Sequence, residues 1–138
     1  MQFISNSVEQ TNELGLALSR VLKIPAMIGF VGELGAGKTQ LVRAIIEGFG
    51  VEESVSSPTY VIEQQYKIDQ GCVSHWDLYR LNSSDIFLEL AELQLSNEAI
   101  VLVEWPSKGA RVQEILDLSI KINFSSDCLL YTSPSPRD

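Results

Sequence analysis

Short apolar runs are the strongest structural signal in this sequence. Residues 26–31 (Ala-Met-Ile-Gly-Phe-Val) and 99–103 (Ala-Ile-Val-Leu-Val) are continuously apolar, the pattern of strands that are buried on both faces. Residues 118–124 alternate between apolar and polar side chains, which predicts a strand with one face in water. The pattern therefore predicts a sheet with a buried centre.

Two further stretches predict an antiparallel hairpin. Residues 59–66 and 72–79 are rich in β-branched and aromatic residues, and Asp69-Gln70-Gly71 between them has turn chemistry. His75 and Asp77 lie two residues apart near the end of the second strand, so we expect their side chains to point to the same face.

Apolar positions recur at helical spacing in three other stretches. Residues 7–22 begin with a capping-box pattern. They continue with a periodic set that we expect to pack on the sheet: Val8, Thr11, Leu14, Leu18, Val21 and Leu22. Residues 40–47 have the same spacing and are followed by a glycine, and residues 82–93 predict a shorter helix. Strands and helices thus alternate along the chain, which is typical of an α/β protein.

Between the apolar run at 26–31 and the helix predicted at 40–47 lies a motif of the form G-x-x-x-x-G-K-[ST]. Its residues are Gly32, Glu33, Leu34, Gly35, Ala36, Gly37, Lys38 and Thr39. Such a loop turns backbone N–H groups toward a phosphate, and the helix adds the positive end of its dipole. Lys38 can then reach the β- and γ-phosphates, and the Thr39 hydroxyl is placed to ligate Mg²⁺. The flanking strand and helix favour a nucleotide site over a chance glycine-rich turn.

Glu104 directly follows the apolar run at 99–103. The carboxyl end of a buried parallel strand lies on the ligand side of an α/β sheet, and in P-loop proteins a carboxylate there holds Mg²⁺ or orients water. A glutamate at a strand end is often only a surface residue, but the glycine-rich motif favours the functional reading. Trp105 comes next, and it either covers the nucleotide or closes the core.

Composition narrows the possible partners. The chain has 138 residues, the length of one domain, and its 45% hydrophobic residues are ordinary for a globular protein. A net charge of −8 with only 10 Lys and Arg argues against direct, strong binding to nucleic acid. Apolar runs are too short to span a membrane, and no export signal is visible. Cys72 and Cys128 have no metal-binding spacing, so we expect a reducing, cytoplasmic setting without a disulfide.

Four sequence blocks carry a family resemblance. Besides the glycine-rich motif they are Ser57-Pro58-Thr59-Tyr60, His75-Trp76-Asp77-Leu78-Tyr79-Arg80-Leu81 and Val103-Glu104-Trp105-Pro106. In this order and spacing, over roughly residues 3–124, the chain resembles the TsaE family, the small P-loop ATPase of bacterial threonylcarbamoyladenosine tRNA modification. The resemblance implies an α/β, P-loop NTPase-like three-layer fold with a mostly parallel central sheet plus an antiparallel hairpin.

The resemblance also implies a function and partners. Members of this family bind ATP or ADP with Mg²⁺ and hydrolyse ATP. They work with TsaB and TsaD, which help install threonylcarbamoyl on the adenosine next to the anticodon of tRNAs that read ANN codons. The resemblance implies that a family member contacts tRNA only indirectly, through its complex with TsaB and TsaD.

Individual roles follow from the same resemblance. Lys38, Thr59, Asp77 and Glu104 form the expected catalytic set, in which Thr59 senses the γ-phosphate or Mg²⁺ and Asp77 lies near the phosphates. Thr39 and Glu104 are the expected metal ligands. Besides the glycine-rich motif, Trp105 and Thr11 are expected beside the nucleotide, Thr11 near the base.

Three other positions in the matching blocks have open roles. Tyr79 and Arg80 are either structural or partner-binding. His75 is expected to be a packed or hydrogen-bonded histidine and not a catalyst.

The end of the chain departs from the family pattern. Residues 125–138 have no amphipathic period and carry two Ser-Pro pairs, so we expect a disordered or extended, non-native tail such as translated read-through. Residues 1–124 then form a single P-loop ATPase domain that lacks its last strand. The strand at 118–124 would be left as an open edge.

Other nucleotide-binding functions are weighed against this one. No Asn/Thr-Lys-x-Asp tetrapeptide for reading guanine is present, which argues against a GTPase. A small-molecule kinase would need a lid, and no Arg-rich lid segment is evident. A non-catalytic, nucleotide-sensing subunit stays open, because P-loop proteins hydrolyse slowly without a supplied arginine or partner.

Overall fold

The computed structural model describes residues 2–32, 37–52, 63–78, 98–105, 115–125 and 128–132. Its strands are β1 (Gln2–Ser5), β2 (Ala26–Gly32), β3 (Glu63–Ile68), β4 (Gly71–Asp77), β5 (Ala99–Glu104), β6 (Leu118–Ser125) and β7 (Cys128–Thr132). Its helices are α1 (Val8–Val21) and α2 (Lys38–Gly48). The short helix predicted at 82–93 lies outside the described residues.

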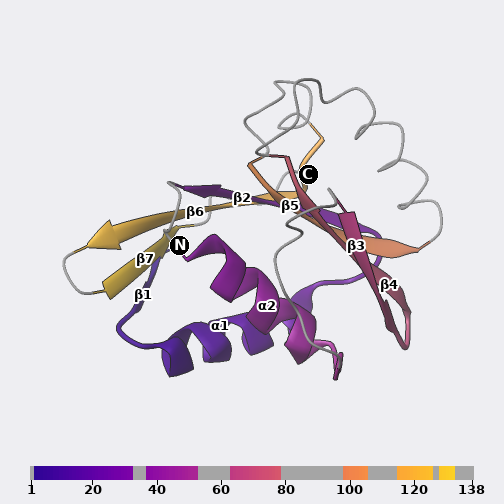
Figure 1. Cartoon of the computed structure of the whole chain (residues 1–138), viewed down its shortest axis with the longest axis horizontal. Coiled ribbons are helices and arrows are strands. Elements are labelled where there is room, and N and C mark those ends of the chain that lie inside the picture. The colour runs from indigo at the N-terminus through magenta and orange to yellow at the C-terminus, as the bar shows by residue number, and fades with distance from the viewer. Residues whose placement is uncertain are drawn as a thin grey trace.

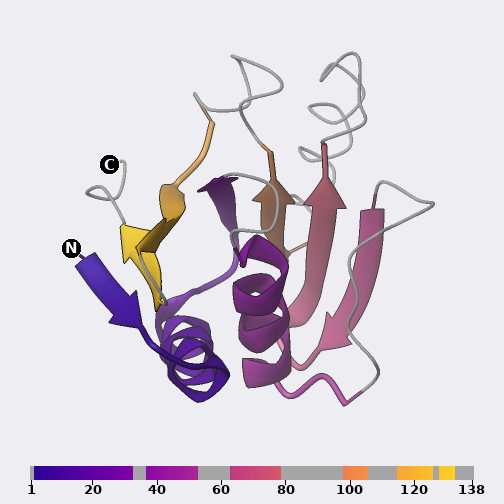
Figure 2. The same ribbon diagram turned by 60° about the vertical axis from the view of Figure 1, so that its left-hand side comes forward.

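The described strands form one seven-stranded sheet in the order β1-β7-β6-β2-β5-β4-β3 (Figure 2). Strand β2 pairs in parallel with β5 and β6, and β5 pairs in parallel with β4. Strands β3 and β4 form the antiparallel hairpin. The mostly parallel sheet with a hairpin is therefore confirmed, and the carboxyl ends of β2, β4, β5 and β6 meet at one edge.

Both faces of the central strands are buried, as their continuous apolar sequences predict. On the face toward the helices, Phe30 and Leu102 pack with Leu41 and Ile45 of α2. On the other face, alternate positions such as Val101 belong to a second apolar cluster. Every residue of β5 is buried, so its last residue, Glu104, is held in a well-packed strand.

The two helices cover the same face of the sheet and run parallel to each other (Figure 1). The parallel direction follows from their contacts, which advance together along both helices: Asn12 accepts a hydrogen bond from Gln40, and Gly15 packs on Ala44. A side chain at Gly15 would collide with the Ala44 backbone, so the glycine permits this close approach. The N-terminal ends of α1 and α2 consequently lie side by side.

Helix α1 begins as predicted, and Thr11, Leu14, Leu18 and Leu22 of its predicted apolar face pack inward. The Ser7 hydroxyl accepts a hydrogen bond from the Gln10 N–H at 3.1 Å, which is an N-cap contact. Val8 and Val21, expected to pack on the sheet, are 57% and 68% exposed. Small residues such as Ser19 take the buried positions, because α1 packs closely on α2.

The segment after Phe124 differs from its prediction. Strand β7 pairs with β6 and with β1, both antiparallel, and thereby joins β1 to the sheet. Of the two alternatives, residues 128–132 are therefore extended and not disordered, and the expectation that β6 is an open edge is wrong. Five residues without an amphipathic period carry little strand signal, and pairing with neighbours on both sides supplies what local sequence does not. The non-native origin of the segment stays a prediction.

No helix among the described residues is long and apolar enough to cross a membrane.

Candidate functional site

The glycine-rich motif connects the carboxyl end of β2 to the start of α2. Gly32 ends β2, and Gly37 precedes Lys38 with φ of 91°, a left-handed conformation that glycine adopts without strain. Glu33, Leu34, Gly35 and Ala36 lie outside the described residues, as do Thr59, Tyr79 and Arg80. The strand and helix required around a phosphate-binding loop are thus both in place.

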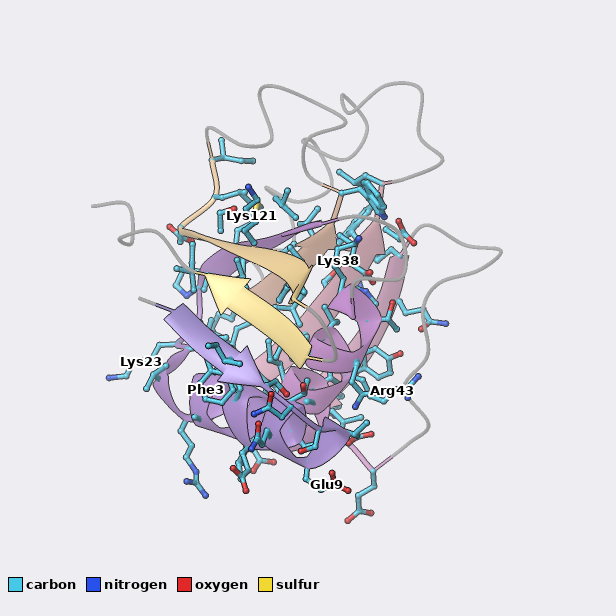
Figure 3. All side chains as sticks on the ribbon, turned by 90° about the vertical axis from the view of Figure 1, so that its left-hand side faces the viewer. Phe3, Glu9, Lys23, Lys38, Arg43 and Lys121 are labelled. Atoms are coloured by element: carbon cyan, nitrogen blue, oxygen red, sulfur yellow. The ribbon has the colours of Figure 1, made fainter. Side chains whose placement is uncertain are left out.

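Lys38 lies at this edge with its side chain almost completely buried, at 4% exposure. Its Nζ donates a hydrogen bond to the Gly32 carbonyl oxygen at 2.7 Å. Burial lowers the pKa of Lys38 from its ordinary value, while the negative charges of Glu104 and Asp77 act in the opposite direction. In Figure 3, the Lys38 side chain lies close to the ribbon among other side chains, whereas the Lys23 side chain extends away from the molecule.

The carboxylate of Glu104 connects the sheet to α2. Its Oε1 accepts a hydrogen bond from the Thr39 hydroxyl at 3.2 Å, and the residue is only 3% exposed. Asp77 is paired with Glu104 in the register of β4 and β5, so both acidic residues lie at the same edge. The structure therefore brings together Lys38 and Thr39, Asp77, and Glu104, which come from three separate stretches of the sequence.

His75 contacts the same carboxylate from β4. Its Nε2 lies 2.6 Å from Glu104 Oε2, and its side chain is fully buried. His75 is thus a buried, hydrogen-bonded histidine, as expected. The sequence did not identify its partner, although the register of β4 against β5 places the two residues on the helix-facing side of adjacent strands.

Trp105 follows Glu104 with its ring over the Lys38 ammonium, 4.0 Å from Nζ to the ring centroid. Its φ of 63° is unusual for a residue with a side chain, and such conformations concentrate at functional sites. Its N–H donates to the Phe30 carbonyl at 3.3 Å, which ties this turn to the end of β2. The ring is partly exposed and packs against the second apolar cluster, and a contact between Trp105 and a nucleotide stays a prediction.

Thr11 lies in the first turns of α1, near the paired helix N-termini. Its hydroxyl is 2.7 Å from the Ser5 hydroxyl, and the side chain is 1% exposed. The neighbouring Asn12 contacts Gln40, the residue after Thr39. Contact between Thr11 and a nucleotide base stays a prediction.

The oxygen atoms of Thr39 and Glu104 suit a hard cation whose other ligands are phosphate oxygens. Mg²⁺ prefers oxygen ligands in octahedral geometry, where adjacent ligands are about 3 Å apart, and the Thr39 and Glu104 oxygens are 3.2 Å apart. Within the described ranges, no three His, Cys, Asp or Glu side chains form a metal-binding cluster. A single carboxylate with a hydroxyl is the set used when phosphate oxygens complete the coordination.

Residues 5–128 match the family model described as threonylcarbamoyl adenosine biosynthesis protein TsaE. The chain belongs to the TsaE family. A relative from Aquifex aeolicus, named tRNA threonylcarbamoyladenosine biosynthesis protein TsaE, is 32% identical over 121 residues, which cover 86% of each chain. TsaE from Haemophilus influenzae is 35% identical over 103 residues, 73% of this chain, and TsaE from Rickettsia conorii is 40% identical over 101 residues, 72% of this chain.

The chain spans 65% of the length of the Haemophilus TsaE and 58% of that of the Rickettsia TsaE. The fold is also that of a solved structure, Bacillus subtilus YdiB, with a TM-score of 0.75 and 23% identity over 96% of this chain and 83% of YdiB. This TsaE-family chain therefore has a P-loop-like fold whose candidate site lies at the expected edge of the sheet.

Proposed function

We propose that this chain is an ATP-binding and ATP-hydrolysing subunit that supports formation of threonylcarbamoyladenosine next to the anticodon of tRNAs reading ANN codons. It acts with TsaB and TsaD. The observation that carries the proposal is the convergence of Lys38, Thr39 and Glu104 at the carboxyl edge of the sheet. The names of its TsaE relatives support the pathway.

The phosphates of ATP or ADP are bound where β2 passes into α2. The first N–H groups of α2 and the Lys38 ammonium donate to phosphate oxygens, and the helix dipole favours the same negative charge. Lys38 exchanges its hydrogen bond with the Gly32 carbonyl for one with phosphate. Trp105 beside it covers the site and excludes water.

Mg²⁺ is held by the Thr39 hydroxyl and the Glu104 carboxylate, together with phosphate oxygens. When bound, the ion supplies positive charge against the negative charge that develops during phosphoryl transfer. Asp77, the register partner of Glu104, is positioned to orient the attacking water. The residues of this chain thus place Mg²⁺, the Lys38 ammonium and the attacking water around one phosphate.

Contact with tRNA is indirect. The chain carries a net charge of −8, whereas phosphate-binding surfaces are normally basic. TsaB and TsaD therefore supply the tRNA-binding surface. Because its proposed substrate pathway modifies tRNA, the protein acts in the cytoplasm.

The test is steady-state ATP turnover by the purified chain with Mg²⁺, alone and with a TsaB–TsaD complex. We expect slow turnover alone and stimulation by the complex, and we expect Lys38→Ala to abolish both. ATP binding without turnover under either condition would replace this function with that of a non-catalytic, nucleotide-sensing subunit. Transfer of the γ-phosphate to a small molecule would identify a kinase.

A further inference from the structure

His75 is the buried polar side chain at this edge for which the proposed chemistry has no use. It lies on β4, behind the carboxylate, and its Nε2 is 2.6 Å from Glu104 Oε2. The other carboxylate oxygen, Oε1, accepts from Thr39. Glu104 is therefore held on both oxygens, by a strand on one side and by a helix on the other.

The hydrogen bond specifies which ring nitrogen carries hydrogen. A carboxylate accepts, so Nε2 must donate, and the hydrogen of a singly protonated ring is then on Nε2. Nδ1 is buried and has no hydrogen-bond partner among the described residues. An unpartnered buried polar atom has a free-energy cost that an apolar side chain would avoid, so packing alone does not account for a histidine here.

The rigid setting makes this contact suited to orientation. His75 is the register partner of Leu102, two residues before Glu104, in the parallel pairing of β4 and β5. Both side chains are almost fully buried, at 1% and 3% exposure. Partners behind a metal-binding carboxylate fix its direction, and losing them typically lowers metal affinity by about 10- to 100-fold.

We propose that His75 is a positioning residue that fixes the Glu104 carboxylate, keeps Oε1 directed at the Thr39 hydroxyl, and so sets the affinity of the site for Mg²⁺. The inference rests on the proposed function for the identity of the ion. It rests on the geometry alone for the contact between His75 and Glu104.

The matched variants are His75→Gln and His75→Asn. Both place an amide in the same buried site, but only the longer glutamine brings its N–H to about the position of Nε2. The readout is the ratio of ADP affinities in Mg²⁺ and in EDTA, measured by calorimetry. We expect His75→Asn to reduce this ratio by about 10- to 100-fold and His75→Gln to stay within a few-fold of wild type, with ADP affinity in EDTA unchanged in both.

Equal ratios in the two variants, whether normal or reduced, would overturn the proposal. A second measurement tests the contact between His75 and Glu104 in the wild-type protein without metal, so it does not depend on a variant folding. His75 is the only histidine in the chain, so ¹⁵N NMR of the wild-type ring reports one residue. We expect hydrogen on Nε2, and hydrogen on Nδ1 alone would contradict the contact. A wild-type chain whose ADP affinity ignores Mg²⁺ would instead defeat the proposed function, while the NMR result would still decide whether His75 orients Glu104.

Discussion

Asp77 and Glu104 are register partners at the carboxyl ends of the adjacent parallel strands β4 and β5. Both carboxylates act on the buried Lys38 ammonium, where their charge opposes the effect of burial on its pKa. An ammonium, two carboxylates and the Thr39 hydroxyl therefore share one edge of the sheet. Such a grouping of opposite charges in a partly buried site is typical of functional sites in P-loop proteins.

Neutralising either carboxylate should separate catalysis from binding. Glu104→Gln and Asp77→Asn remove a charge at nearly constant shape, so packing should hold. We expect ATP turnover to fall by roughly 10- to 100-fold or more in each variant, with ADP affinity in EDTA much less affected. Single-turnover and equilibrium-binding measurements check this, and wild-type turnover in both variants would assign the two residues to structure.

Removing the Lys38 ammonium should weaken nucleotide binding itself. Lys38→Ala loses a charge-assisted hydrogen bond to phosphate, and we expect ATP affinity to fall by about 10- to 100-fold. Lys23→Ala is the matched control, because Lys23 is exposed and follows α1 at the opposite end of β2. Calorimetry with ATP and GTP gives the measurement. An unaffected Lys38→Ala protein, or equal affinity for GTP, would contradict an adenine nucleotide site.

Gly15→Ala should reverse the usual effect of this substitution. Inside a helix, replacing glycine by alanine normally stabilises by about 0.5–1 kcal/mol. Here the new methyl group would lie 2.7 Å from the Ala44 carbonyl carbon and 2.9 Å from the Ile45 nitrogen, so α1 must move away from α2. We expect a loss of about 1–3 kcal/mol in the free energy of unfolding, measured with urea. A stabilised variant would show that the two helices are not so closely packed.

Deleting residues 128–138 should lower the melting temperature. The deletion removes β7, so β1 loses its pairing partner and β6 becomes an open edge. We expect a fall of roughly 5 °C or more in Tm, with nucleotide affinity at low temperature retained because the site lies at β2, β4 and β5. An unchanged Tm would mean that β7 contributes nothing to stability.

The sheet centre was predictable from local sequence. Residues 26–31 and 99–103 are apolar throughout and too short for a typical helix, which favours strands covered on both faces. The glycine-rich motif was equally informative, because its flanking strand and helix are visible in the same pattern. Glu104 could be placed at the ligand edge for the same reason.

Contacts between distant elements were not predictable. The partner of His75 depends on the register of β4 against β5, which no local pattern encodes. Apolar periodicity correctly placed Leu14, Leu18 and Leu22 against the core. It did not show that Val8 and Val21 are exposed, because α1 also packs on α2 through small residues. Strand β7 likewise depends on pairing with β1, which lies at the other end of the chain.

The central claim is that this site supports threonylcarbamoyladenosine formation on tRNA through ATP. The most direct test is to express the chain in bacteria depleted of their own TsaE and to measure threonylcarbamoyladenosine in bulk tRNA by mass spectrometry. We predict that the chain restores the modification and that its Lys38→Ala variant, at equal abundance, does not. A well-folded chain that leaves the modification at the depleted level, or a Lys38→Ala variant that restores it as fully as the unaltered chain, would contradict the claim.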